Sequence, residues 1–292
     1  MTSYSQNTEM NTFDSFSSKR VSFCLATKDK APYLEKALES FRDSGLITSK
    51  DELIIVDGNS ADGTQEVVKK FSDIVTVFIS EPDTSGQHAI NKAFLLASGK
   101  YIKYLTDDDI YYSKATEQAV AIMEQHPEID MLLCGGTKER NGRVWDYYVP
   151  RGIGYGRRSE DLFKYRGATG VGHFFRRSSL AKIGVLYPRR PSADSAFVLD
   201  FIKNGGVVRF CRINAYHHTI YDHSWVVAHR GEHIRDTFAL CWEYCSFWFY
   251  IQFRFLTPFK KFIIKVYGKI IRSYLKPVPA VLSSEIWDGE LS

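Results

Sequence analysis

Apolar and polar residues alternate in blocks along the first 110 residues, and these blocks predict alternating strands and helices. Short apolar runs have the length and composition of buried strands. They are Val21–Ala26, Leu53–Val56, Ile74–Ile79 and Tyr101–Leu105. Between them, apolar residues recur at helical spacing. We expect helices from Pro32 up to Gly45, over Thr64–Phe71 and over Ala89–Ala97.

This alternation predicts an α/β fold with a mostly parallel central sheet and flanking helices. In such sheets, ligands bind outside the carboxyl ends of the strands. Thr27 follows the first expected strand, Asp57 follows the second, and the triplet Asp107-Asp108-Asp109 lies beyond the fourth. We therefore expect these side chains to line one site.

After residue 112 the pattern changes. Asn141-Gly142 lies between two segments that read as strands, which is typical of a β-hairpin with a tight turn. Gly- and Arg-rich sequence from Arg151 to Gly172 favours a mobile loop over the site. The other expected elements are a helix over Ser113–Gln125, a helix over Ala193–Lys203 capped by Ser192, and a strand over Val207–Ile213.

We expect three parts in the chain. Residues 1–19 are rich in Ser, Thr and Asn and favour a flexible segment. Residues 20–225 form the α/β domain, with one half over 20–112 and a second over 113–225. Residues 226–292 form an aromatic and basic helical region.

Two segments of this C-terminal region differ in character. Residues 238–256 are dense in aromatic side chains, but charged and polar residues interrupt them, which makes a poor membrane-crossing helix. On a helical wheel of residues 259–276, five basic side chains share one side and apolar residues cover the other. This pattern is typical of an amphipathic helix on an anionic membrane surface. The alternative is a helix packed on the domain with a solvated lysine face.

Composition and charge narrow the function classes. The 292 residues are 44% hydrophobic and 25% charged, which is ordinary for a globular protein. The net charge of +4 is too small to argue for nucleic acid as a partner. The five cysteines include no CxxC pair, so we expect neither a zinc ribbon nor a disulfide framework. With no secretory signal at the N-terminus, these features favour a cytoplasmic protein.

The aspartate triplet has two interpretations. Like charges at close range raise one another's pKa values unless a cation relieves them. A hard divalent ion with oxygen ligands, Mn²⁺ or Mg²⁺, would do so and would also bind a diphosphate. A solvated acidic turn before the helix at Ser113 is the alternative.

Motifs that surround the triplet resemble those of the family 2 glycosyltransferases, which have the GT-A fold. They occur in the order Val21–Thr27, Ile54–Thr64, Ser80–Gly86, Ala89–Lys92 and Leu105–Asp109, and the resemblance extends over about residues 21–221. It implies a Rossmann-like GT-A domain with a C-terminal amphipathic helical extension. It also implies that residues 20–112 hold a nucleoside diphosphate-sugar donor, that residues 113–225 face the acceptor, and that transfer inverts the anomeric carbon.

The resemblance also implies roles for single residues. Thr27 and Asp57 match positions that hold the base and ribose. Asp107, Asp108 and Asp109 match the three positions of the DXD region, which carries ribose and metal contacts. Relatives often have Asp only at the third of these positions, so the register is open by one residue; Asp108 is the first choice for the metal ligand, and Asp109 is included with it. Asn91 and Lys92 match a recurrent pair near the donor, where Lys92 faces either a phosphate or solvent.

Inverting transfer needs a base, and the resemblance places it at Asp194, before the expected second-half helix. Alternatively, Asp194 is a first-turn aspartate that favours the helix dipole. His173 resembles an acceptor-side residue, or it is a satisfied interior histidine. Of the histidines that follow the strand over Val207–Ile213, namely His217, His218 and His223, we take His218 as a metal ligand, although the residues do not decide among them. His229–His233 matches a metalloprotease pattern by letter, but Gly231 weakens the helix that it requires.

The resemblance therefore implies an inverting glycosyltransferase of the bacterial surface-polysaccharide type. Its acceptor would be a glycan, and the amphipathic C-terminal segment favours a lipid-linked one. The enzyme would lie peripherally at the inner face of the cell membrane. One alternative is a nucleotidyltransferase on a related fold, although the segment Thr27–Lys30 lacks the glycines of such a phosphate loop. Another alternative is a non-catalytic, membrane-associated relative.

Overall fold

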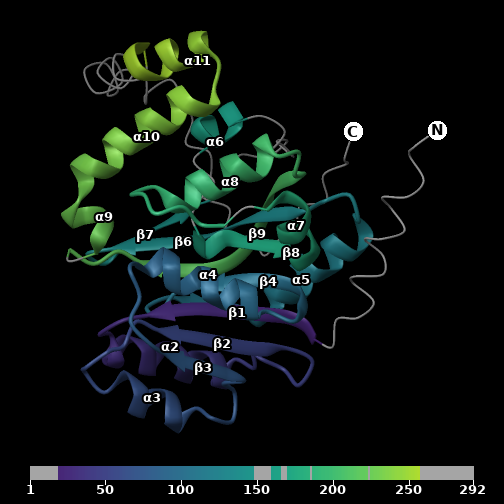
Figure 1. The fold of residues 1–292 in the computed structure, drawn as a ribbon, viewed down its shortest axis with the longest axis vertical. Helices are drawn as coiled ribbons and strands as arrows, with labels where there is room; N and C mark the ends of the chain where they lie inside the picture. Colours follow the sequence, from purple (N-terminus) through teal and green to yellow (C-terminus); the bar gives the residue numbers. More distant parts are fainter. Residues whose placement is uncertain (1–18, 148–158, 166–169, 185, 223, 257–292) are drawn as a thin grey trace.

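The computed structural model describes residues 19–147, 159–165, 170–184, 186–222 and 224–256 (Figure 1). The flexible segment expected before residue 19 and the basic amphipathic helix expected over 259–276 lie outside these residues. The centre of the described chain is a nine-stranded sheet with helices on both faces.

The first half of the sheet is parallel, as its sequence predicts. Its strands lie in the order β3-β2-β1-β4 and all pair in parallel. They are β1 (Lys19–Thr27), β2 (Glu52–Asp57), β3 (Val77–Ser80) and β4 (Gly99–Leu105). The crossovers are α2 (Ala31–Asp43), α3 (Thr64–Lys70) and α4 (Gly86–Leu96). The register pairs Thr27 with Asp57 and Asp57 with Ser80, so these carboxyl ends are level.

Side chains alternate between two apolar cores because successive strand residues point to opposite faces. In β1, Phe23 and Leu25 contact the core under α2, whereas Cys24 contacts the core under α4. A strand that is buried on both faces reads as a continuous apolar run, which is why these strands were recognisable in the sequence.

The second half of the sheet is mixed, so the prediction of a mostly parallel sheet holds only for the first half. Strand order continues from β4 as β8-β6-β9-β5, with β7 paired to β6. β8 is antiparallel to both β4 and β6, whereas β6 and β9 are parallel. The strands are β5 (Ile110–Tyr111), β6 (Met131–Arg140), β7 (Arg143–Tyr147), β8 (His173–Arg176) and β9 (Val208–Thr219).

The predicted hairpin between β6 and β7 is confirmed. Asn141 and Gly142 have φ values of 52° and 75°, the left-handed conformation that a two-residue turn of this kind requires at both positions. The predicted helices α5 (Ser113–Gln125) and α8 (Ala193–Lys203) are also confirmed, with the expected bounds.

The expected loop over residues 151–172 contains helical structure in its described parts. These are α6 (Ser159–Tyr165) and a 3₁₀ turn, Gly170–Gly172. Buried Leu162 anchors α6 on the core beneath α8, which a reading by Gly and Arg content alone does not reveal. The remaining residues of that range lie outside the described part.

Helices after β9 extend away from the sheet (Figure 1). They are α9 (Trp225–Ala228), α10 (Arg230–Tyr244), α11 (Phe247–Ile251) and a π-helical turn, Gln252–Leu256. The short helix α7 (Arg177–Ile183) instead lies between β8 and α8 in the chain and packs against β4 and β8. α10 packs against α6 and α8. Among the described helices, none has both the length and the apolar character that crossing a membrane demands.

Candidate functional site

Asp57 lies at the carboxyl end of β2 and is fully buried. Its carboxylate accepts a hydrogen bond from the Ser80 hydroxyl at 2.6 Å and one from the Ser60 backbone N–H at 3.1 Å. The Ser60 hydroxyl donates a further bond to it. Thr27 is its register neighbour on β1. The two side chains predicted to hold the nucleoside therefore lie side by side at one edge of the sheet.

The aspartate triplet follows β4 at the same edge. Asp107 is 8% exposed, and one of its oxygens accepts the Thr27 hydroxyl at 2.8 Å. Lys30 Nζ lies 3.4 Å from Asp107 and 3.2 Å from Asp108. Burial raises the pKa of Asp107 to about 6, although the Lys30 charge opposes this shift. The carboxylates of Asp107 and Asp108 thus share one ammonium group at the carboxyl end of β4.

Asp109 points to the opposite strand and contacts His218. The side chain of Asp109 is buried, and its two oxygens lie 2.8 Å and 2.9 Å from His218 Nδ1 on β9. The Thr219 N–H and the Thr106 hydroxyl also donate to this carboxylate. His217 instead contacts Thr137 and Glu139, and His223 lies outside the described residues. Of the two histidines that the structure describes here, His218 is the one beside the triplet.

Residue types at this position suit a divalent ion. Carboxylate oxygens are the ligands that Mn²⁺ and Mg²⁺ prefer, and an imidazole nitrogen suits Mn²⁺ better than the harder Mg²⁺. Within the described ranges, however, no three His, Cys, Asp or Glu side chains are already arranged to hold a metal. Lys30 sits at Asp107 and Asp108, while Asp109 and His218 bond to each other. Binding of an ion would require these side chains to exchange partners.

Asp194 lies in the first turn of α8, as predicted. Its carboxylate accepts a hydrogen bond from the N–H of Gly170 at 3.1 Å and another from the N–H of Ser195 at 2.8 Å. Burial raises its pKa, and these two bonds oppose the shift. Burial, together with the charges of Asp194 and of the triplet, also raises the pKa of Tyr104 at the end of β4. Tyr104 also packs against Gly170, whose N–H donates to Asp194, so it lies between the candidate base and the end of β4.

Two lysines near the acidic residues were not predicted as site residues. Lys30 lies three residues after the end of the first strand, so the rule that ligands bind at strand ends could have identified it as a site residue. Lys138 lies on β6 opposite His218. Burial lowers its pKa to about 8, although the charges of Asp194 and Asp109 oppose this shift. From sequence alone, a lysine in a hairpin strand is expected to face solvent, so nothing near Lys138 in the sequence indicates that it is a site residue.

Three other predicted residues have partners of their own. The side-chain amide of Asn91 makes two hydrogen bonds of 2.9 Å to the Tyr187 backbone. Lys92 forms an ion pair with Glu81 at 2.6 Å. His173 is fully buried, its Nδ1 lies 2.6 Å from the Tyr187 hydroxyl, and burial lowers its pKa to about 3. Its burial fits the interior alternative, but the side chain is only half satisfied, because Nε2 has no hydrogen-bond partner among the described residues. The donor and acceptor roles of the three residues remain predictions.

Acidic side chains thus gather at the carboxyl ends of the parallel strands, where α/β sheets bind their ligands, and a further aspartate opens a helix of the second half. The model of one protein family, described as glycosyl transferase family 2, matches residues 22–184, more than half of the chain. The chain belongs to this family.

Curated relatives agree with this assignment. An uncharacterized glycosyltransferase of Methanocaldococcus jannaschii is 33% identical over 135 residues, which is 44% of this chain and 42% of the relative. A second, from Mycoplasma pneumoniae, is 23% identical over 44% of each chain. The chain thus spans less than half the length of these relatives.

Solved structures share the fold. TarS 1–349 of S. aureus, crystallised with UDP-GlcNAc, has a TM-score of 0.59 at 18% identity, over 69% of this chain and 59% of that one. The mannosyltransferase PcManGT of Pyrobaculum calidifontis, with GDP-Man and Mn²⁺, has a TM-score of 0.58 at 18% identity, over 78% and 65%. The predicted GT-A fold is confirmed.

Proposed function

We propose that this protein transfers a sugar from a nucleoside diphosphate-sugar to a glycan acceptor, with inversion at the anomeric carbon. One observation carries the proposal: Tyr104, at the end of the strand that leads into the triplet, packs against Gly170, whose N–H donates to Asp194. A donor site and a base for the acceptor thus adjoin within one domain. Relatives of the same fold were crystallised with UDP-GlcNAc and GDP-Man, which supports a donor of this class.

On this proposal, Thr27, Asp57 and Asp107 bind the nucleoside part of the donor. Their hydroxyl and carboxylate oxygens suit the N–H edges of a base and the hydroxyls of a ribose. Lys30 faces the diphosphate once it leaves the carboxylates, and Asn91 and Lys92 remain candidates for donor contacts. Asp108, Asp109 and His218 would hold Mn²⁺ or Mg²⁺, which stabilises the leaving diphosphate when bound.

Asp194 acts as the general base. It accepts the proton of the attacking acceptor hydroxyl, and a carboxylate whose pKa is raised by burial is better matched to this task at neutral pH. A single base on one side of the sugar is what an inverting displacement needs. His173, buried behind Tyr187, would act on the acceptor side only by supporting that residue.

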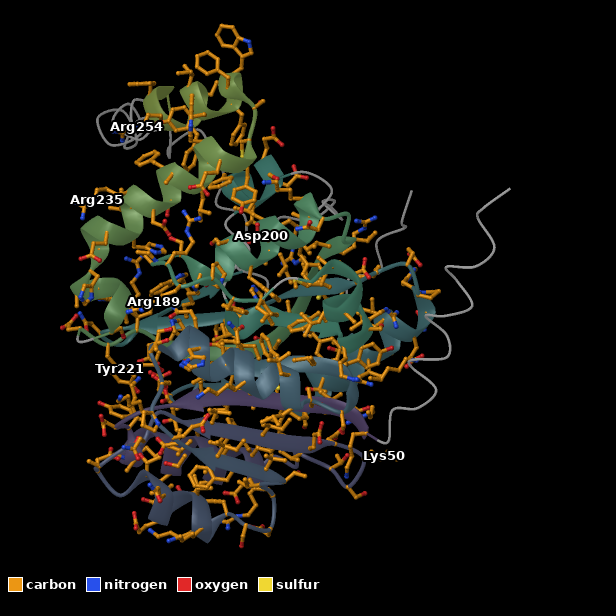
Figure 2. All side chains as sticks on the ribbon, viewed as in Figure 1. Lys50, Arg189, Asp200, Tyr221, Arg235 and Arg254 are labelled. Carbon is orange, nitrogen blue, oxygen red and sulfur yellow. The ribbon has the colours of Figure 1, made fainter. Side chains whose placement is uncertain are left out.

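We further propose that the acceptor is lipid-linked, in surface-polysaccharide assembly, and that the protein lies peripherally at the inner face of the membrane. Large apolar side chains on and after α10 support this: Trp242 is 57% exposed and Trp248 is 74% exposed. An open pocket of about 550 Å³ on the same helices includes Arg235 and Arg254 in its lining. Figure 2 shows both arginines away from the sheet. Aromatic and cationic side chains together favour an anionic membrane surface.

A donor panel tests the proposed function. UDP, GDP, CDP and dTDP and several of their sugars would be titrated by calorimetry with and without Mn²⁺. We expect metal-dependent binding of one nucleotide, lost in Asp57→Ala and Asp108→Ala but retained in Asp194→Asn. Metal-dependent hydrolysis of the selected nucleotide sugar should then be lost in Asp194→Asn. If the folded protein binds none of these nucleotides, the non-catalytic alternative is correct.

A further inference from the structure

The first turn of α8, which carries Asp194, is hydrogen-bonded to α10. The Ser192 N–H donates to Asp236 at 2.8 Å, and the Ser192 hydroxyl lies 3.0 Å from His233 Nδ1. Ser192 is only 1% exposed. It occupies the N-cap position, but its side chain makes no capping bond to α8, since the hydroxyl is directed to α10 instead. The predicted cap therefore serves a contact between two helices.

An arginine just before this turn strengthens the same contact. Arg190 donates to both oxygens of Asp236, from Nη2 to Oδ1 at 2.7 Å and from Nε to Oδ2 at 3.3 Å, which is a bidentate geometry. Its Nη1 lies 3.0 Å from Glu243, the acidic residue that follows Asp236 along α10. Asp236 thus receives hydrogen bonds both from Arg190 and from Ser192, whereas Glu243 contacts only Arg190 of these two.

The geometry of Asp194 depends on where this turn lies. Its hydrogen bonds, to Gly170 and Ser195, come from backbone N–H groups, and Ser195 belongs to the turn itself. A shift of the turn therefore moves the carboxylate and loosens the bonds that orient it. A displacement of about 1 Å at a reacting group can lower the rate by about 100-fold.

We propose that Ser192, His233 and Asp236 are positioning residues, through which α10 fixes the Asp194 carboxylate against the acceptor. The proposal rests on the proposed function of Asp194 as the base. It makes α10 part of the catalytic unit, although the sequence placed it beyond the domain boundary at residue 225. The proposal also gives His233 a role other than the metal ligand that the metalloprotease pattern would make it. Its ring is hydrogen-bonded to Ser192, the residue that precedes α8.

The charged and titratable groups around Asp194 set the direction of the effect. Lys138 faces it from β6, His233 from α10, Tyr104 from β4, and Tyr187 from the segment before α8. Burial raises the pKa of Asp194, whereas the N–H bonds and the charges of His233 and Lys138 lower it. Loosening the turn or removing His233 therefore raises that pKa.

Matched variants distinguish a role in positioning Asp194 from a role only in attaching α10 to the domain. Asp236→Ala removes the bond to Ser192, whereas Glu243→Ala removes an Arg190 partner on the same helix and leaves that bond in place. His233→Leu removes the ring contact, and His233→Asn keeps a polar atom near the position of Nδ1. The readout is metal-dependent hydrolysis of the nucleotide sugar selected by the donor panel, with water as acceptor, followed as kcat and KM against pH.

We expect Asp236→Ala and His233→Leu to lower kcat by about 10- to 100-fold, with the donor KM within about twofold of the wild type. The acid limb of the kcat profile should move to higher pH. His233→Asn should recover much of kcat, and Glu243→Ala should match the wild type. Equal effects of Asp236→Ala and Glu243→Ala would overturn the proposal, as would unchanged kcat and pH profiles in the first two variants.

Hydrogen exchange of the intact protein gives a readout that does not depend on activity. Amides at the start of α8 should exchange faster in Asp236→Ala and His233→Leu than in the wild type or Glu243→Ala. Unchanged exchange in all variants would contradict the proposed contact. If exchange changes as expected but the wild type binds and hydrolyses no nucleotide sugar, then the proposed function fails while the link between α10 and α8 stands.

Discussion

Lys30 offers a direct test of whether the triplet is a cation site. Its ammonium lies 3.4 Å from Asp107 and 3.2 Å from Asp108, and its side chain is 37% exposed. A divalent ion at these carboxylates would compete with it. Lys30→Met removes the charge, keeps a side chain of similar length, and leaves the two carboxylates without this partner.

The structure sets the size of the effect. A partly exposed ion pair contributes about 0.2–1 kcal/mol, so the two contacts together contribute about 1 kcal/mol. Without metal, Lys30→Met should lower the free energy of unfolding by about this amount, which is a fall in Tm of about 2–4 °C for a chain of this size. Because the competing ammonium is gone, Mn²⁺ should bind about fivefold more tightly, the equivalent of about 1 kcal/mol.

The assay is thermal unfolding with EDTA and with increasing Mn²⁺, in the absence of nucleotide. Lys28→Met is the matched control, since Lys28 is an exposed lysine of the same segment. Lys30→Met should be less stable than the control in EDTA and should regain stability at lower Mn²⁺ concentrations. Equal Mn²⁺ dependence in both variants would refute the idea that Lys30 and a metal share these carboxylates.

Three further predictions follow from single contacts. Asp194→Asn should lower kcat by about 10²–10⁴-fold in steady-state assays while nucleotide affinity by calorimetry is unchanged. The folded-state pKa of Asp107, about 6, exceeds its ordinary value of 3.8, so the folded protein holds this proton more tightly than the unfolded chain does. The free energy of unfolding should therefore contain a contribution that falls as pH rises from about 4 to 6, and urea titrations of Asp107→Asn should lack that fall. Gly172→Ala should destabilise the protein by about 1–3 kcal/mol in the same titrations, because a Cβ there would overlap the Cys134 carbonyl oxygen.

Sequence patterns predicted the first half of the fold because each element there carries its own signal. A doubly buried strand such as β2 is a continuous apolar run, and the helices between strands show helical spacing. The strand-end rule then places Thr27, Asp57 and the triplet together without any knowledge of their contacts. Local chemistry at Asn141-Gly142 fixed the hairpin in the same way.

Pairings in the second half depend on contacts between distant segments, which no local pattern reports. β8 lies between β4 and β6 and is antiparallel to both, although its four residues carry no mark of direction. For the same reason, the sequence did not predict every residue of the candidate site. Lys138 becomes a neighbour of Asp109 and Asp194 only because β6 pairs with β9.

The contact between α8 and α10 shows that functional contacts between distant segments are also missing from local sequence patterns. His233 and Asp236 are three residues apart on one helix, so the sequence places them on one face but does not say what that face contacts. Their partner Ser192 lies about 40 residues away, and its own sequence signal, a helix cap, describes a bond that its side chain does not make. A pattern of letters suggested a metal on the histidines of this segment. The geometry instead directs His233 toward the turn that holds Asp194, so α10 acts on the candidate base through hydrogen bonds to that turn.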